Sequence, residues 1–303
     1  MRIESDGVGL NVEVSGPADG PPVVFLHGVS GSARTYEWLP AEITDGRRII
    51  LVDLRGHGRS EHAPGSYVID RYGGDVADVL REVAGRPAVL VGHSLGGVTA
   101  WWVAQRHPDL VRAAFLEDPP LFMGEPDEHE KNPMAKLFPL VRDRAIGWQR
   151  DGVEVSVAAE EMGAAPFAPD PSVTMGDVVC DDALLTSADA HLRMDPEVLT
   201  GAADRSTLAP TDTTAAVAVP VLILAADDAL GAAFPSAHER RLAQTHPSVE
   251  VVRVAGAGHG IHSERAHRSA YVQHLSDFLR RHTDRPVSDA GGSRAEGARA
   301  PAD

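Results

Sequence analysis

Residues 88–104 constrain the fold of this chain more than any other stretch of the sequence. The stretch opens with an aliphatic run at 88–91, which has the composition of a strand buried on both faces. It then turns through Gly-x-Ser-x-Gly at 92–96 and continues as an apolar segment typical of a buried helix. A serine at such a turn needs a strained backbone, and glycines beside it remove Cβ atoms that would collide with neighbouring backbone. We therefore predict a strand, a sharp turn at Ser94 and a helix.

This arrangement is called a nucleophile elbow, because it presents the serine hydroxyl at the end of a strand. A bare Gly-x-Ser-x-Gly arises often by chance, so the flanking strand and helix carry the prediction. Ser94 is the candidate nucleophile.

Short apolar runs alternate with helical segments on both sides of the elbow. The pattern indicates βαβ units and a mostly parallel sheet. Residues 10–14 alternate apolar and polar side chains, as an antiparallel edge strand does. The predicted buried strands lie at 23–26, 48–52, 88–91, 111–116, 221–224 and 249–254, and the predicted helices at 33–43, 69–83, 236–245 and 263–281.

The alternation stops after Pro120 and resumes near residue 219. Residues 121–218 are helical and irregular in pattern and contain methionines and aromatic residues. We interpret 1–120 and 219–283 as one α/β core, and 121–218 as a helical cap over the carboxyl edge of the sheet, where open α/β sheets bind ligands. Residues 284–303 are rich in Gly, Ala, Ser and Arg without periodicity, which predicts a disordered tail.

Composition excludes several classes of partner. The formal net charge is -16 and no basic patch is visible, which argues against binding nucleic acid. No run approaches the roughly 20 apolar residues that span a bilayer, and the N-terminus lacks a secretory segment, so we expect a cytoplasmic protein with no membrane partner. The single cysteine, Cys180, precludes an intrachain disulfide. Nothing in the sequence specifies an oligomeric state.

Three motifs taken together resemble the α/β-hydrolase superfamily. They are His27-Gly28 after one predicted strand, the elbow around Ser94, and Gly258-His259 near the end of the chain. The resemblance implies an α/β-hydrolase fold, with a mostly parallel sheet flanked by helices and a helical cap insertion. It also implies that His259 is the general base and that the backbone N–H groups of Val29 and Leu95 form the oxyanion hole. The glycine-rich loop that begins at Asp53 is common in the superfamily, and we expect it to be architectural.

A serine is a poor nucleophile at neutral pH and needs a general base within hydrogen-bonding reach. Histidine suits this task because its pKa lies near neutral pH. His57 and His93 occupy variable positions of their motifs. We expect His262 and His267 to be surface residues or to act behind the site.

The triad acid has two candidate positions. The usual superfamily location follows the strand at 221–224, where Asp227 and Asp228 stand. The common pattern there has glycine at the strand end and aspartate three residues later, whereas this chain has alanine and earlier aspartates.

The second location follows the strand after the elbow helix, where haloalkane dehalogenases and fungal zearalenone lactonases carry an acid. Asp118 lies 24 positions after Ser94, at such a strand end, next to Glu117. Strand alternation turns only one of these two side chains toward the site, and the spacing favours Asp118. Asp227 and Asp228 remain the alternative acids.

The sequence therefore predicts a cofactor-free serine hydrolase of a small apolar carboxylic ester or lactone. Serine at the elbow disfavours dehalogenases and epoxide hydrolases of this fold, which place aspartate there. No residues have metal-ligand spacing and no glycine loop has a phosphate-binding pattern, so we expect neither a metal nor a cofactor. The alternatives are a non-catalytic small-ligand receptor on the same fold, a cofactor-free perhydrolase, and a C–C bond hydrolase.

Overall fold

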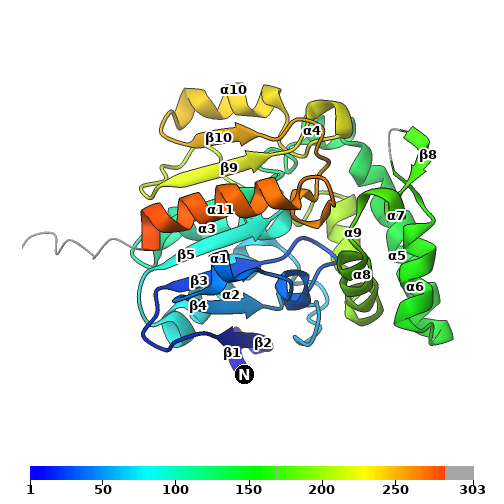
Figure 1. Cartoon of the computed structure of the whole chain (residues 1–303), viewed down its shortest axis with the longest axis horizontal. Helices are drawn as coiled ribbons and strands as arrows, with labels where there is room; N and C mark the ends of the chain where they lie inside the picture. The colour runs from blue at the N-terminus through cyan, green and yellow to red at the C-terminus, as the bar shows by residue number, and fades with distance from the viewer. Residues whose placement is uncertain (168–169, 284–303) are drawn as a thin grey trace, which may run out of the picture.

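The computed structural model describes residues 1–167 and 170–283, so the tail predicted at 284–303 lies outside the described residues. The described chain forms one large sheet of eight strands in the order β1-β2-β4-β3-β5-β6-β9-β10 (Figure 1). Neighbours from β4 to β10 run parallel, and β1 and β2 extend the sheet antiparallel, which confirms the mostly parallel sheet. The strands are β1 (Arg2–Ser5), β2 (Val8–Ser15), β3 (Pro22–Leu26), β4 (Arg48–Val52), β5 (Ala88–His93), β6 (Val111–Glu117), β9 (Val221–Ala225) and β10 (Glu250–Arg253).

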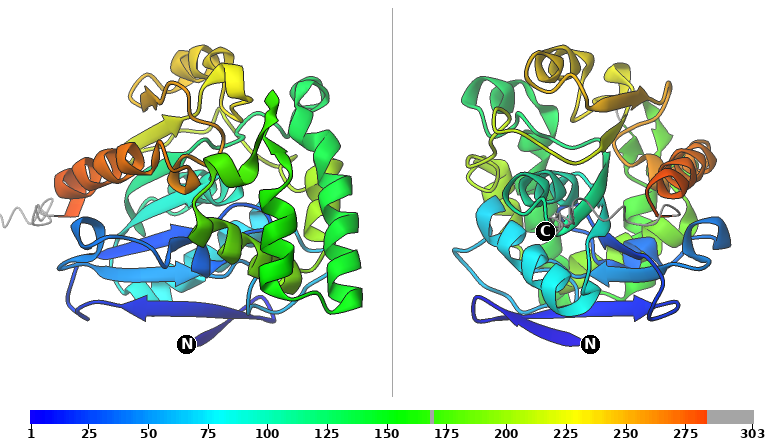
Figure 2. Two further views of the ribbon diagram at one scale, coloured as in Figure 1. Left: turned by 45° about the vertical axis from the view of Figure 1, so that its right-hand side comes forward. Right: turned by 90° about the vertical axis from the view of Figure 1, so that its left-hand side faces the viewer.

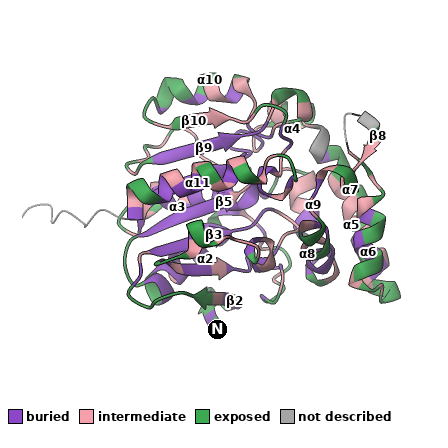
Figure 3. Ribbon diagram, in the orientation of Figure 1, coloured by how far each residue is buried: buried purple, intermediate pink, exposed green. Residues whose placement is uncertain are grey.

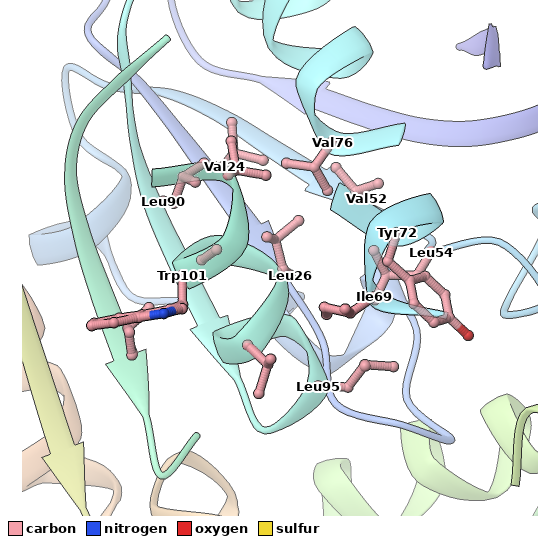
Figure 4. Close-up of a cluster of buried hydrophobic side chains, with 14 of the residues drawn as sticks. Val24, Leu26, Val52, Leu54, Ile69, Tyr72, Val76, Leu90, Leu95 and Trp101 are labelled. Carbon is pink, nitrogen blue, oxygen red and sulfur yellow. The ribbon is translucent and has the colours of Figure 1, made fainter. Parts of the chain in front are cut away.

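Both faces of the sheet are covered by helices, because the central strands present apolar side chains on both sides. On one face, Val24 and Leu90 pack against α2 (Ile69–Val79) and α3 (Leu95–Arg106), as Figure 4 shows. The alternate residues of the same strands pack on the opposite face against α1 (Ala41–Thr44) and α11 (Arg268–Thr283). The central strands are buried along their length (Figure 3), which explains their unbroken aliphatic composition.

The helix α10 (Ser236–Thr245) precedes β10, and most of the remaining elements lie between β6 and β9. The elements between β6 and β9 stand beside the carboxyl ends of the parallel strands (Figures 1 and 2), at the edge predicted for the cap. Some of their apolar residues, including Trp148 and Leu184, form a small core of their own. These elements are α4 (Pro126–Lys131), α5 (Pro133–Asp151), α6 (Val155–Gly163), β7 (Pro166–Phe167), β8 (Asp170–Thr174), α7 (Met175–Val178), α8 (Asp181–Arg193) and α9 (Val198–Ala203).

Three predicted helices differ in extent from those in the structure. The helix expected at 33–43 is a 3₁₀ turn at Ala33–Tyr36 followed by the short α1, which begins directly after Pro40. The helix predicted at 69–83 is α2, which ends at Val79, followed by a wider π-helical turn at Leu80–Ala84 that ends at Gly85. The last helix, α11, begins at Arg268 rather than near residue 263. Among the described helices, none combines the length and apolar character needed to cross a membrane.

The first turn of α3 lies against the end of β3 with no room for a side chain. A Cβ atom at Gly96 would lie 2.1 Å from the backbone oxygen of Leu26. This close approach fixes the distance between the start of α3 and the loop that follows β3.

We expect Gly96→Ala to lower the free energy of unfolding by about 1–3 kcal/mol, because two backbone segments would have to separate. Urea unfolding of the variant measures this loss. The control is Gly74→Ala on α2, where a new Cβ would meet nothing within 4 Å. That substitution should be neutral or stabilise by about 0.5–1 kcal/mol, since alanine favours the helix. Equal unfolding midpoints for the two variants would contradict the close-approach argument.

Candidate active site

Ser94 lies at the junction between β5 and α3, as predicted. Its backbone has φ 52° and ψ −116°, a region that non-glycine residues rarely occupy. A Cβ atom at Gly92 would lie 2.3 Å from the backbone oxygen of Gly96, so the motif glycines are required sterically. The Ser94 N–H donates to the backbone oxygen of Glu117 at 3.0 Å, which ties the turn to the end of β6. The side chain of Ser94 is mostly buried and lines a cavity.

Val29 and Leu95, the predicted oxyanion-hole residues, line the same cavity as Ser94. Leu95 is the first residue of α3, where backbone N–H groups have no partner within the helix. The loop that carries Val29 is held by buried His27, whose Nδ1 bonds the Gly28 oxygen at 2.8 Å and whose Nε2 accepts from Leu54 N–H. Burial lowers the pKa of His27 to about 4, so the ring is neutral and serves as a fixed structural link.

His259, the predicted base, contacts Asp118 directly. The distance from His259 Nδ1 to Asp118 Oδ2 is 2.7 Å, and the imidazole also lines the cavity. The fully buried Asp118 carboxylate accepts further hydrogen bonds from the N–H groups of Ala226, Ala233 and Phe234. These bonds hold both the carboxylate and the loop that follows β9.

The hydrogen bond between His259 and Asp118 shifts the pKa of both groups. Burial alone would raise the pKa of Asp118, but the contact with His259 and the backbone N–H donors bring it below its ordinary value. Burial would likewise lower the pKa of His259, whereas the hydrogen bond to Asp118 and the nearby carboxylates raise it above its ordinary value. The ionised carboxylate orients the ring with Nδ1–H as the donor, which leaves Nε2 to accept a proton.

Asp227 and Asp228, the alternative acids, bond to other groups. Asp227 accepts from the N–H groups of Ala229 and Gly256, and Asp228 bonds Ser236 N–H and Arg253. Both side chains therefore help to shape the loops around β9 and β10. Asp118 contacts His259 in the structure, whereas Asp227 and Asp228 bond to other groups.

A second carboxylate–histidine pair lies beside the first. Glu117 is fully buried and accepts from both the backbone N–H and Nδ1 of His262, the latter at 2.8 Å. The ring of His93 packs between His259 and His262, with ring centroids 4.8 and 4.9 Å away. Burial would raise the pKa of Glu117, but His262 and His93 lower it below its ordinary value.

The Glu117–His262 pair was not predicted from the sequence, because strand alternation argued against two carboxylates that both face the site. Asp118 lies past the end of β6 and has a left-handed backbone, φ 42°, so alternation stops at Glu117. Both side chains can then reach histidines of the loop after β10. Two features of the sequence could have indicated the second pair. They are the adjacent acids at 117 and 118 and the three-residue spacing of His259 and His262.

Among the described residues, one group has ligand atoms close enough together to hold a metal ion. It consists of His93, Glu117 and His262, whose ligand atoms lie within 4.8 Å of one another. Their atoms already make hydrogen bonds: His93 Nε2 lies 3.1 Å from the His259 backbone oxygen, and Glu117 pairs with His262.

Asp53 accepts hydrogen bonds from the backbone N–H groups of Ala33 and Arg59. These bonds give it the architectural role expected of its loop.

The cavity has a volume of about 380 Å³ and lies between the sheet edge and the cap helices. Its walls are largely apolar and come from the loops after β3, β5 and β6 and from α5, α8 and α9. Mostly apolar clefts of this size suit small organic ligands.

Comparison with known proteins identifies the family. A family model described as alpha/beta hydrolase fold matches residues 21–266. The chain belongs to the α/β hydrolase fold family. The superfamily resemblance and the fold class predicted from the three motifs are therefore confirmed.

Individual relatives of this family are similar to the chain to different extents. A 2-(acetamidomethylene)succinate hydrolase of Mesorhizobium japonicum is 36% identical over 117 residues, or 39% of this chain and 41% of that protein. The match thus spans about two fifths of that relative's length.

Among solved structures, an E-2-(acetamidomethylene)succinate hydrolase has a TM-score of 0.69 at 23% identity, covering 92% of this chain and 98% of that one. An enzyme that degrades N-acyl homoserine lactones has a TM-score of 0.66 at 23% identity, covering 92% and 100%. At these identities the two structures establish likeness of fold.

We expect Asp118→Asn to lower kcat for ester hydrolysis by about ten-thousand-fold, because the imidazole loses the carboxylate that orients it. In the unaltered protein the acidic limb of the kcat/KM profile should have its midpoint above the ordinary histidine pKa, since Asp118 raises the pKa of His259. Activity then rises with pH as His259 loses its proton. Steady-state rates across pH measure both effects.

The matched control is Asp227→Asn, which removes a half-buried carboxylate from the alternative location. Its kcat should stay within about tenfold of the unaltered protein. An inactive, folded Asp227→Asn protein beside an active Asp118→Asn protein would assign the acid to the loop after β9.

We expect Glu117→Gln to destabilise the protein by about 1–3 kcal/mol, because a buried charge-assisted hydrogen bond to His262 is lost. The substitution should also move the acidic limb of kcat/KM to lower pH, since the Glu117 charge raises the pKa of His259. Exposed Glu125→Gln, which breaks the surface ion pair with Arg241, should cost no more than about 1 kcal/mol. Urea unfolding and pH profiles of both variants test the role of Glu117. An unchanged stability and profile for Glu117→Gln would refute it.

Proposed function

We propose that this chain is a cofactor-free serine hydrolase of carboxylic esters or lactones. The observation that carries the proposal is the 2.7 Å hydrogen bond between His259 Nδ1 and Asp118 Oδ2, at the wall of the cavity that Ser94 also lines. A nucleophile on an elbow, an imidazole oriented by a buried carboxylate and a mostly apolar cavity are the parts that acyl transfer requires.

In the first half of the reaction, the Ser94 hydroxyl attacks the carbonyl carbon while His259 Nε2 takes its proton. The resulting oxyanion accepts hydrogen bonds from the backbone N–H groups of Val29 and Leu95, each worth a few kcal/mol of barrier. Collapse of the tetrahedral intermediate breaks the bond to the leaving alkoxide, which receives the proton from His259. An acyl-enzyme ester on Ser94 remains, and a lactone substrate stays attached as a single ring-opened chain.

In the second half, His259 takes a proton from water as the water attacks the acyl-enzyme carbonyl. The same two N–H groups stabilise the second oxyanion. Collapse returns the proton to Ser94 and releases the carboxylic acid. Asp118 keeps its charge throughout and stabilises the imidazolium at each proton transfer.

The choice of an ester or lactone bond rests on the serine nucleophile and on the family's members. One protein of similar fold degrades N-acyl homoserine lactones, which contain a lactone ring. The apolar residues of the cavity wall favour a substrate whose acyl or alcohol part is apolar and small enough for about 380 Å³.

We expect the protein to release p-nitrophenol from p-nitrophenyl acetate in a burst equal to the enzyme concentration, followed by slower turnover, where deacylation limits the rate. Ser94→Ala should abolish the burst and lower kcat by about three to six orders of magnitude. Stopped-flow absorbance measures both phases.

The matched control is Ser206→Ala, which removes the hydroxyl of an exposed serine outside the cavity and should leave the burst intact. Full turnover by Ser94→Ala would overturn the mechanism. Ligand binding without any ester or lactone turnover would favour the receptor alternative.

A further inference from the structure

The charge of the cavity wall is opposite to that of the protein. The chain carries a formal net charge of -16, yet no Asp or Glu is among the described residues that line the cavity. Two arginines line it instead, Arg144 from α5 and Arg205 from the segment after α9. This reversal of charge in one place is the property expected of an anion-binding site.

Arg144 differs from the other arginines of its helix. Arg142 forms an ion pair with Asp143, and Arg150 forms an ion pair with Asp151. Arg144 is partly buried, makes no ion pair with any described residue, and has a buried Nε atom without a hydrogen-bond partner. Its guanidinium packs over the ring of Trp148 at 4.9 Å, which holds the group in place without neutralising it.

Burial has the largest effect on the pKa of Arg144 and lowers it, whereas Glu161 raises that pKa electrostatically. No ion pair joins these two described residues. The Glu161 carboxylate accepts from Trp148 Nε1 at 2.8 Å. Because a guanidinium stays protonated in proteins, Arg144 carries a partly desolvated positive charge at the cavity wall.

Arg205 supplies a second guanidinium with unused donors. Its Nη1 donates to the backbone oxygen of Gly124 at 3.0 Å, and no ion pair links it to a described carboxylate. Its backbone is left-handed, φ 65°, a conformation that costs free energy for a residue other than glycine.

His191, which lines the cavity from α8, adds hydrogen-bonding capacity without positive charge. Burial lowers the pKa of His191 to about 4, so this ring is neutral at physiological pH. The two arginines keep their positive charge across the neutral range.

A partly buried, unpaired guanidinium is costly unless a ligand supplies its counter-ion, and carboxylates match its planar donor geometry. We propose that the substrate is an ester or lactone that also bears a carboxylate, and that Arg144, with Arg205 as a second contact, binds this carboxylate. This inference rests on the proposed hydrolase function. The cavity then orients the substrate by its two ends, with the scissile carbonyl at Ser94 and the carboxylate at the cap.

The test compares two esters that differ only in the terminal charge, mono-p-nitrophenyl glutarate and p-nitrophenyl pentanoate. We expect kcat/KM of the unaltered protein to be at least about tenfold higher for the anionic ester. In Arg144→Gln the ratio of the two kcat/KM values should fall by about ten- to a hundredfold, mainly through KM of the anionic ester. Arg144→Lys, which keeps the charge, should retain part of the preference.

Arg142→Gln is the matched control, because Arg142 lies on the same helix and outside the cavity wall. Its ratio should equal that of the unaltered protein. Circular dichroism and unfolding midpoints establish that each variant is folded. The inference is overturned if the unaltered protein shows no preference for the anionic ester, or if Arg144→Gln and Arg142→Gln give the same ratio. Either result would leave the proposed ester hydrolysis through Ser94 untouched.

If neither ester is hydrolysed, the proposed function fails, and a binding measurement decides the anion site separately. Calorimetric titration with glutarate should then give binding to the unaltered protein that weakens about tenfold or more in Arg144→Gln. Equal glutarate binding by the two proteins, or no binding by either, would overturn the anion site.

Discussion

The buried Asp118 carboxylate is the interaction on which the architecture of the site depends. A charge withdrawn from water must be fully hydrogen-bonded, and Asp118 meets this requirement with one histidine and three backbone N–H groups. The three N–H groups belong to the loop after β9, the loop predicted as the alternative source of the acid. This loop therefore acts as a donor to an acid from the neighbouring strand. The arrangement is possible because β6 and β9 are adjacent and parallel, so their carboxyl ends meet at one place.

Three buried histidines near the site, His27, His57 and His93, are neutral structural groups, whereas the pKa of His259 is raised. Burial lowers the pKa of His27 to about 4 and of His57 and His93 to about 3, so these rings hold loops as neutral hydrogen-bonding groups. His259 differs because a carboxylate faces its Nδ1 directly. Glu117 adds a second negative charge behind the site, and His93 separates the two carboxylate–histidine pairs. The environment of each ring, rather than its position in a motif, determines its charge.

The sequence was sufficient to predict the parallel sheet, the elbow and the fold family, because unbroken aliphatic strands and motif glycines leave few alternatives. Spacing also favoured Asp118, the acid that the structure places against His259. The Glu117–His262 pair was not predictable from alternation, since a left-handed residue at 118 ends the strand geometry. The helix expected at 33–43 breaks before Pro40, and β1 was not predicted. The unpaired state of Arg144 depends on tertiary packing between cap helices, which local pattern does not encode.

In a chain of this kind the catalytic acid cannot be assigned from the strand equivalent to β9 alone. Aspartates are present after β9, at 227 and 228, yet their side chains bond to neighbouring loops. On the proposed mechanism, a survey of relatives that scores only that position would select the wrong residue, because Asp118 from the adjacent strand is the carboxylate that contacts His259. The contact with the histidine, rather than the presence of a carboxylate at a strand end, identifies the acid.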